Sequence, residues 1–134
     1  MQDTFGIKDD TLLKAAGSFT GGIGGQNDVC GALIGSCMML GAAFGRGRQD
    51  DMPKLRASIM QSGEFYKWFK KEFGSVKCRE LLTEFGDGVF YDLHDTSHAE
   101  QVKNVMEKCD LLVEKVAARA AEILSESKES EKKD

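Results

Sequence analysis

The chain has 134 residues, of which 41% are hydrophobic and 30% charged, values that suit one globular domain with one core. Its formal net charge is −4, with both signs mixed along the chain, so it lacks the basic face expected of a nucleic-acid-binding protein. The longest apolar stretch, from Val29 to Phe44, is shorter than the ~20 residues that span a bilayer, so we expect no membrane insertion. No secretory signal follows Met1, and we therefore expect a cytoplasmic protein.

The first predicted helix begins at Asp9 or Asp10, which are N-cap candidates, and continues to Phe19. The glycine-rich segment at residues 21–25 then breaks the helical pattern. Such a segment before a helix could hold a phosphate. No strand precedes it and no Gly-Lys-Ser/Thr follows, so a turn that allows tight entry into the next helix is the better interpretation.

The second predicted helix starts with Asn27 or Asp28 as its cap and continues to about Phe44. It is apolar nearly all round, which is typical of a central, buried helix. Its small residues leave room for other backbones to approach closely: Gly31, Ala32, Gly35, Ser36, Ala42 and Ala43.

The third predicted helix has Pro53 in its first turn and ends at Gly74-Ser75. Its apolar residues recur at three- and four-residue steps: Met52, Leu55, Ile59, Tyr66, Phe69 and Phe73. A short helix from Ser75 or Lys77 through Leu82 follows, and residues 85–97 read as a loop.

Ser97 is the expected cap of a long last helix, whose apolar stripe consists of Val102, Val105, Met106, Cys109, Leu112, Val113, Val116, Ala120 and Ile123. The sequence therefore predicts an all-α fold, a single compact bundle of about five helices within residues 1–124. Residues 125–134 contain no apolar side chain and are expected to form a charged, disordered tail. The heptad-like last helix could also pair with a second copy, and we expect a homodimer.

The cysteines are the main chemical feature of the sequence, because four cysteines in a reducing compartment suggest free thiols, a metal site or a catalytic redox pair. Cys30 is expected in the first turn of the buried helix. Cys78 is expected at the start of a short helix, next to Lys77 and Arg79. A helix N-terminus and cationic neighbours favour a thiolate, so both cysteines are candidates for reactive or metal-ligating residues. The alternative is that both are small buried residues.

The other two cysteines have less distinctive settings. Cys37 lies seven residues after Cys30, a rise of about 10.5 Å along one helix. A disulfide needs Cα atoms within about 7 Å, so Cys37 cannot pair with Cys30 and is expected to pack in the core. By periodicity alone, Cys109 is also a core residue.

His94 and His98 are spaced i, i+4, and Asp92 and Asp95 are close to them. On one helix this spacing could bind zinc, and a zinc-dependent enzyme is a weaker hypothesis. Here the pair lies across a loop and a helix start, without an HExxH pattern, so solvated loop histidines are the better interpretation.

Taken together, the cysteine segments resemble a known family. The segment Cys30-Gly31-Ala32-Leu33-Ile34-Gly35 resembles the CGAxxG element of the C_GCAxxG_C_C family. Lys77-Cys78-Arg79-Glu80-Leu81-Leu82 and the region from Cys109 to Ile123 resemble its later cysteine segments. The family is thought to be redox-active. A similar domain occurs in split-Soret cytochromes, where its cysteines are proposed to hold an iron–sulfur cluster.

The resemblance implies that Cys30, Cys78 and Cys109 converge in space, as redox thiols or as ligands of a metal or iron–sulfur cluster. It also implies electron transfer with a redox partner protein. The family's first cysteine has no counterpart between Met1 and Gly25, so either residues are missing before Met1 or this member has lost a ligand. A fourth ligand could then be Cys37, one of the two histidines or a residue of a second chain. No CxxCH segment for covalent haem is present.

The sequence therefore supports two main hypotheses. In the first, the protein is a thiol or iron–sulfur redox module that uses Cys30, Cys78 and Cys109. In the second, it is a helical binding or assembly module with merely buried cysteines.

Overall fold

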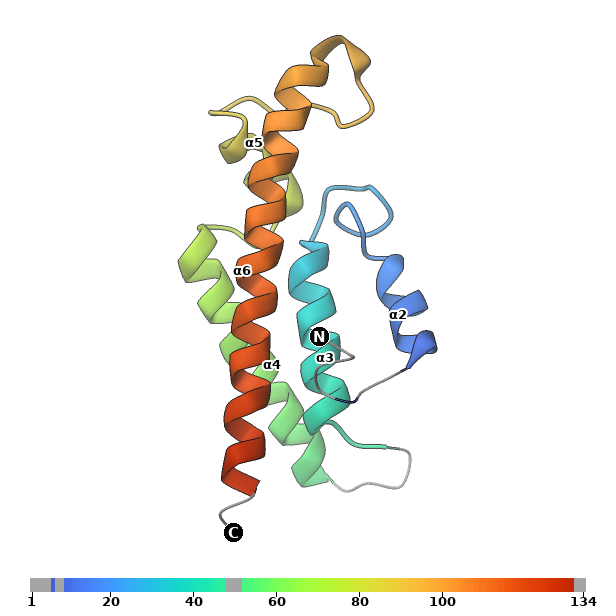
Figure 1. Ribbon diagram of the computed structural model, residues 1–134, viewed down its shortest axis with the longest axis vertical. Coiled ribbons are helices and arrows are strands. Elements are labelled where there is room, and N and C mark those ends of the chain that lie inside the picture. Colours follow the sequence, from blue (N-terminus) through green and yellow to red (C-terminus); the bar gives the residue numbers. More distant parts are fainter. Residues whose placement is uncertain (1–5, 7–8, 48–51, 132–134) are drawn as a thin grey trace.

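The computed structural model describes residues 6, 9–47 and 52–131 (Figure 1). Its elements in chain order are α2 (Asp10–Gly17), α3 (Gly31–Phe44), α4 (Met52–Phe73), α5 (Cys78–Phe85), the short 3₁₀ helix η1 (Thr96–His98) and α6 (Ala99–Glu131). Within these residues the extended backbone pairs at one isolated bridge, between Val29 and Lys77. The predicted all-α fold is confirmed.

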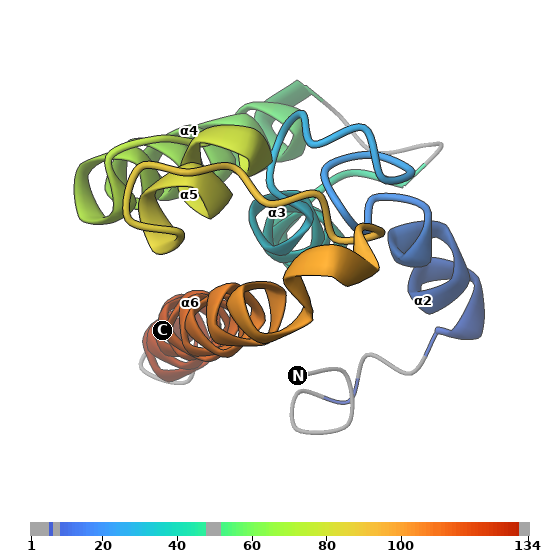
Figure 2. The same cartoon turned by 90° about the horizontal axis from the view of Figure 1, so that it is seen from above.

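Helix α3 lies at the centre of the molecule, as its apolar sequence predicted. It packs against α2, α4 and α6, which surround it in the view from above (Figure 2). Leu33, Met39 and Leu40 are buried on it, and Ser36 is its buried polar residue. Gly45 follows the helix and donates its N–H to the carbonyl of Gly41, which closes the last turn.

Helix α4 begins and ends close to the predicted positions, with Pro53 in its first turn and Gly74 directly after its last residue. Its buried residues are Phe65 and Phe69, and only Phe69 belongs to the predicted apolar stripe. Ile59 and Tyr66 from that stripe are exposed, so apolar spacing alone gave the helix but not the face that it buries.

The long helix α6 runs antiparallel to α4 along the whole bundle (Figure 1). Its buried residues recur at steps of seven and then four residues along one stripe: Val105, Leu112, Val116, Ala120 and Leu124. No helix among the described residues combines the length and apolarity that crossing a membrane requires.

The structure differs from the sequence prediction at both ends of α6. Asp95, not Ser97, provides the cap: its carboxylate accepts the backbone N–H of Ser97, which lies inside η1 directly before α6. At the other end the helix continues through residues 125–131, which the sequence had assigned to a disordered tail. Polar helix formers can extend an existing helix without burial, because propagation is far easier than nucleation. Residues 132–134 lie outside the described part of the chain.

Candidate functional site

The glycine-rich segment between α2 and α3 folds back on itself as a compact turn. Gly21 and Gly22 adopt left-handed φ angles of +67° and +68°. The N–H groups of Ile23, Gly24 and Gly25 bond to carbonyls at the end of α2 and just after it, so the turn uses these amides itself. This agrees with its interpretation as a structural turn rather than a phosphate cradle.

Two glycines are required because the turn presses against the start of α3 and α5. A Cβ on Gly22 would lie 2.8 Å from the Cβ of Cys78 and 2.6 Å from the backbone N of Asp28. A Cβ on Gly31 would lie 2.5 Å from the carbonyl oxygen of Phe19. Both distances are shorter than side-chain carbons tolerate, so the glycines permit the close approach.

A short antiparallel bridge then joins two segments that are far apart in the sequence. The N–H of Cys30 donates to the Val76 carbonyl (2.8 Å), and the N–H of Cys78 donates to the Asp28 carbonyl (2.6 Å). The Lys77 ammonium and the Asp28 carboxylate add an ion pair at the same place. The bridge therefore fixes the start of α5 against the start of α3.

The register of this bridge puts two cysteines on one face. Val29 and Lys77 are directly opposite each other, so Cys30 is opposite Val76 and Cys78 is opposite Asp28. Side chains of opposite residues share a face and alternate along each strand, so Cys30 and Cys78 are diagonal neighbours on the face away from Val29. Cys30 is the N-cap residue of α3, not a residue of its first turn as the sequence suggested, and Cys78 is the first residue of α5.

Helix α6 brings the third cysteine to the same place. Cys30, Cys78 and Cys109 all line one cavity of about 330 Å³. Cys30 and Cys78 are 7% and 9% exposed, and Cys109 is half-buried. The rest of the lining is mostly apolar or glycine: Ala16, Thr20, Gly21, Gly22, Gly31, Ala32, Leu82, Leu93, Met106, Asp110 and Val113.

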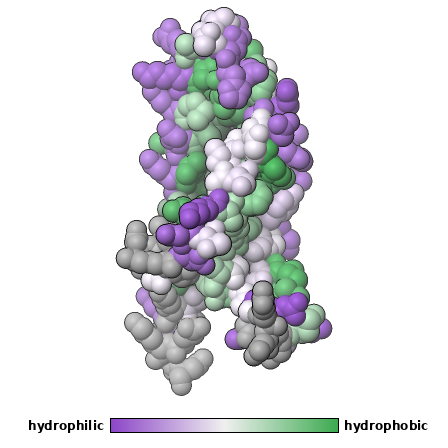
Figure 3. Space-filling view, turned by 90° about the vertical axis from the view of Figure 1, so that its right-hand side faces the viewer, coloured by the Kyte–Doolittle hydropathy of each residue, from purple (hydrophilic) through white to green (hydrophobic). Residues whose placement is uncertain are grey.

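Two of these lining residues were assigned by the sequence to the apolar stripe of the last helix and not to a site. Met106 and Val113 lie three residues before and four residues after Cys109, so helical spacing places them on its face. Both are partly exposed. The face of the molecule on the α2 side has hydrophobic residues along its middle and hydrophilic ones along its edges (Figure 3).

Cys37 does not line this cavity. It is half-buried on α3 and packs against the main core, and burial raises the pKa of its thiol, an effect that the Ser62 side chain on α4 partly offsets. Its predicted place in the core is confirmed, and it offers an internal control for the other three cysteines.

The Cys78 thiol is not activated in the way the sequence suggested. Burial raises the pKa of Cys78 to about 11, and the neighbouring Cys30 and Cys109 thiols add to the shift. Burial also raises the pKa of Cys109. The expected cationic partners are engaged elsewhere, because Lys77 pairs with Asp28 and the Arg79 guanidinium lies 4.1 Å from the centre of the Phe90 ring. Cys78 is therefore a thiol, not a thiolate, at neutral pH.

The histidines lie in a different setting. His94 is in the loop before η1, and His98 Nδ1 lies 3.0 Å from Ser97 Oγ and 3.2 Å from Asp95 Oδ2. These contacts belong to the cap of the helix and are exposed. In the described part of the chain, no group of three or more His, Cys, Asp or Glu side chains is arranged to hold a metal ion.

Fold and site together define a class: an all-helical protein in which two helix starts and one long helix gather three thiols around one apolar cavity. The sequence model of the family described as "Putative redox-active protein (C_GCAxxG_C_C)" matches residues 1–123. The chain belongs to this family, as the resemblance of its cysteine segments had indicated. No curated protein and no solved structure matches the chain.

Proposed function

We propose that the protein is a thiol redox module in which Cys30 and Cys78 exchange between a dithiol and a disulfide, with Cys109 as the third thiol of the site. The observation that carries this proposal is that these three cysteines line one cavity while Cys37 does not. The redox role of the family agrees with it.

The Cys30–Cys78 pair is favoured because both cysteines flank the same backbone bridge. Diagonal neighbours of an antiparallel pair are typically about 7–8 Å apart. A disulfide has Cα atoms about 4.4–6.8 Å apart, so a small tightening of the bridge brings the pair within range. Gly22 has no side chain to separate the glycine-rich turn from Asp28 and Cys78, so these two residues of the bridge lie close together beside it.

The reaction partner in this proposal is a protein disulfide. One cysteine loses its proton to solvent, and its thiolate attacks the partner's disulfide, which gives a mixed disulfide and releases one partner thiolate. The second cysteine then attacks the mixed disulfide. The Cys30–Cys78 disulfide forms, the partner leaves as a dithiol, and two electrons have passed to the partner. The reverse sequence reduces the protein.

The raised pKa of Cys78 affects the rate of this exchange. A thiol with a pKa of about 11 is almost entirely protonated at pH 7, so its attack is slow until a partner changes its surroundings. Exchange at Cys78 would thus be slow with a small disulfide and faster with a docked partner.

The test compares single cysteine variants during redox titration with reduced and oxidised dithiothreitol. We expect the wild type and Cys37→Ser to lose two thiols reversibly, whereas Cys30→Ser and Cys78→Ser do not. Free thiols are counted after denaturation, and mass spectrometry of the oxidised peptides identifies the bridge. Four free thiols at every potential, or a bridge that contains Cys37, would refute the proposal.

A second candidate is an iron–sulfur cluster or a soft metal held by Cys30, Cys78 and Cys109. Three thiols in an apolar cavity are the right donor chemistry for such a group. Their present arrangement does not fit a single metal ion. Anaerobic reconstitution with iron and sulfide, followed by elemental analysis, separates the two candidates. Cluster binding requires iron and sulfide that Cys109→Ser loses and Cys37→Ser keeps.

The remaining candidate is a homodimeric binding module with structural cysteines. Leu111 and Val113 on α6 are 64% and 44% exposed, which would suit contact with another chain. This function is favoured if all four thiols stay reduced, no metal binds, and light scattering gives the mass of two chains.

A further inference from the structure

A second cavity lies away from the cysteines, in a groove between α4 and α6. Its volume is about 620 Å³, within the range of small-molecule sites. Both helices pack on α3, and the ion pair between Glu72 and Lys115 ties α4 to α6 next to the Lys71 end of the groove. The groove therefore belongs to the bundle itself and not to a loop.

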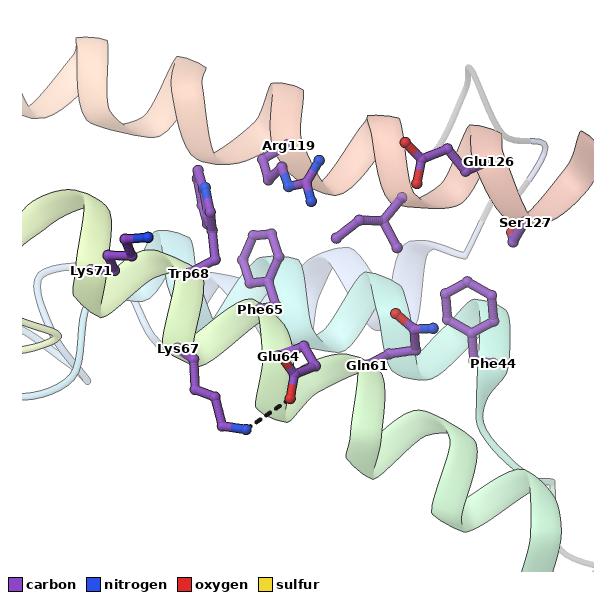
Figure 4. A pocket seen from close by; sticks show the side chains of 11 residues that line it. Phe44, Gln61, Glu64, Phe65, Lys67, Trp68, Lys71, Arg119, Glu126 and Ser127 are labelled. Atoms are coloured by element: carbon purple, nitrogen blue, oxygen red, sulfur yellow. Dashed lines mark hydrogen bonds and ion pairs between the residues drawn. The ribbon is translucent and has the colours of Figure 1, made fainter.

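The walls of the groove are apolar and aromatic. Phe65 is buried, and its ring centre lies 5.3 Å from that of Trp68. Ile123 lies on α6, and Phe44 at the end of α3 lines the far end (Figure 4). An apolar body of a ligand would be in contact with hydrophobic surface along this length.

Arg119 is the polar group in the middle of the groove. Its Nη1 donates to Glu122 at 2.9 Å, which holds one side of the guanidinium. Its Nε is buried and has no hydrogen-bond partner among the described residues. A buried donor without an acceptor is unfavourable, and the Nε side of a guanidinium matches the two oxygens of a carboxylate.

The charges of the lining favour an anion at one end. They comprise the cations Lys67, Lys71 and Arg119 and the carboxylates Glu64 and Glu126. Lys67 pairs with Glu64 at 2.7 Å, on the side of α4 away from Arg119 (Figure 4). Glu126 lies at the opposite end of the groove from Lys71 (Figure 4). Lys71 thus lies at the cationic end, with the Trp68 side chain between it and Arg119 in the middle of the groove (Figure 4).

We propose that this groove binds a small organic carboxylate with an apolar body, its carboxylate on Arg119 and its body along Phe65, Trp68 and Ile123, with the Lys71 ammonium favouring an anion from the other side of Trp68. The orientation follows from the charges, because the other end of the groove carries Glu126. The site is separate from the cysteine cavity, so binding does not depend on the redox state of the thiols.

Trp68 is the only tryptophan of the chain, so its fluorescence reports on this groove directly. The probes are decanoate, 2-naphthoate and decan-1-ol, which separate an alkyl carboxylate, an aryl carboxylate and a neutral alkyl body. We expect saturable changes in Trp68 emission with at least one carboxylate, and binding about tenfold or more tighter than that of decan-1-ol, as charge-assisted hydrogen bonds provide.

Three variants locate the carboxylate. Arg119→Gln is expected to weaken carboxylate binding by about tenfold, Lys71→Gln to weaken it by about threefold, and both to leave decan-1-ol unchanged. Lys67→Gln is the matched control, because its ammonium is already paired, and should change binding less than about twofold. Cys30→Ser should bind as the wild type does, which keeps this test independent of the proposed redox function.

The proposal is overturned if Trp68 emission stays constant up to the solubility limit of both carboxylates. It is equally overturned if decan-1-ol binds as tightly as they do, or if Lys71→Gln and Arg119→Gln, folded by circular dichroism, keep full affinity.

Discussion

At the scale of single residues, the site depends on glycine as much as on cysteine. The thiol of Cys78 lies in the cavity because nothing projects from Gly22 toward it. The CGA segment follows the same rule, since Gly31 lets the carbonyl of Phe19 come close to the start of α3. These two glycines thus determine how closely residues 19–22 can lie against the starts of α3 and α5.

Gly22→Ala tests this role. The new Cβ would meet both the backbone N of Asp28 and the Cβ of Cys78 and would sit at a left-handed φ, so we expect the protein to lose about 2–4 kcal/mol of unfolding free energy. Gly24→Ala is the control, because its φ is +58° but its Cβ would meet nothing within 4 Å. Urea unfolding measures both variants. Equal losses would show that the close approach to Cys78 has no energetic consequence.

At the scale of elements, the start of the longest helix depends on a side-chain cap. Asp95 accepts hydrogen bonds from the backbone N–H and the hydroxyl of Ser97, and the ring of His98 lies beside the same carboxylate. The Ser97 hydrogen bonds, followed by the contact with His98, lower the pKa of Asp95 to about 2. The cap thus prefers the ionised carboxylate.

Asp95→Ala should therefore lower thermal stability at neutral pH. Because the folded-state pKa lies below the ordinary 3.8, the contribution of Asp95 is present above about pH 4 and disappears as the pH falls toward 2. The melting-temperature difference between wild type and variant should shrink over this range. Amide hydrogen exchange at residues 97–100 should be faster in the variant. A difference that is constant from pH 7 to 2 would contradict the ionised cap.

At the scale of the whole molecule, α3 is the central helix of the bundle. Three helices pack on it, and two cavities lie on either side of α6: one lined by the cysteines and one by Arg119 and the aromatic residues of α4. The thiols of Cys78 and Cys109 are withdrawn from water by this packing, which raises the pKa of each. Thiol ionisation is therefore coupled to global unfolding.

Alkaline pH should destabilise the fold through these thiols. The pKa of Cys78 rises from 9.0 to about 11 on folding, so its stabilising contribution is complete below pH 9 and is lost as the pH rises through 11. Under reducing conditions, unfolding free energies at pH 8, 9, 10 and 11 should fall more steeply for the wild type than for Cys78→Ala. Identical slopes would mean that Cys78 titrates normally in the folded protein.

The sequence by itself determined the helices, because each has a 3.6-residue apolar period, a breaker or a cap that acts locally. It also determined that α3 is central, since a helix that is apolar all round has to be covered on every side. The family resemblance indicated that Cys30, Cys78 and Cys109 belong together, which periodicity alone did not show for Cys109. Each of these inferences uses either residues that are close together in the chain or the order of the cysteine segments along it.

The tertiary structure decided the chemistry of the site. The bridge between Val29 and Lys77 joins segments 48 residues apart, and no local pattern gives its register. It makes Cys30 a cap and pairs Lys77 with Asp28, so Lys77 is not the partner of a Cys78 thiolate that the sequence had suggested. Burial then sets the pKa of that thiol, because desolvation depends on everything packed around it and not on the residues beside it in the chain.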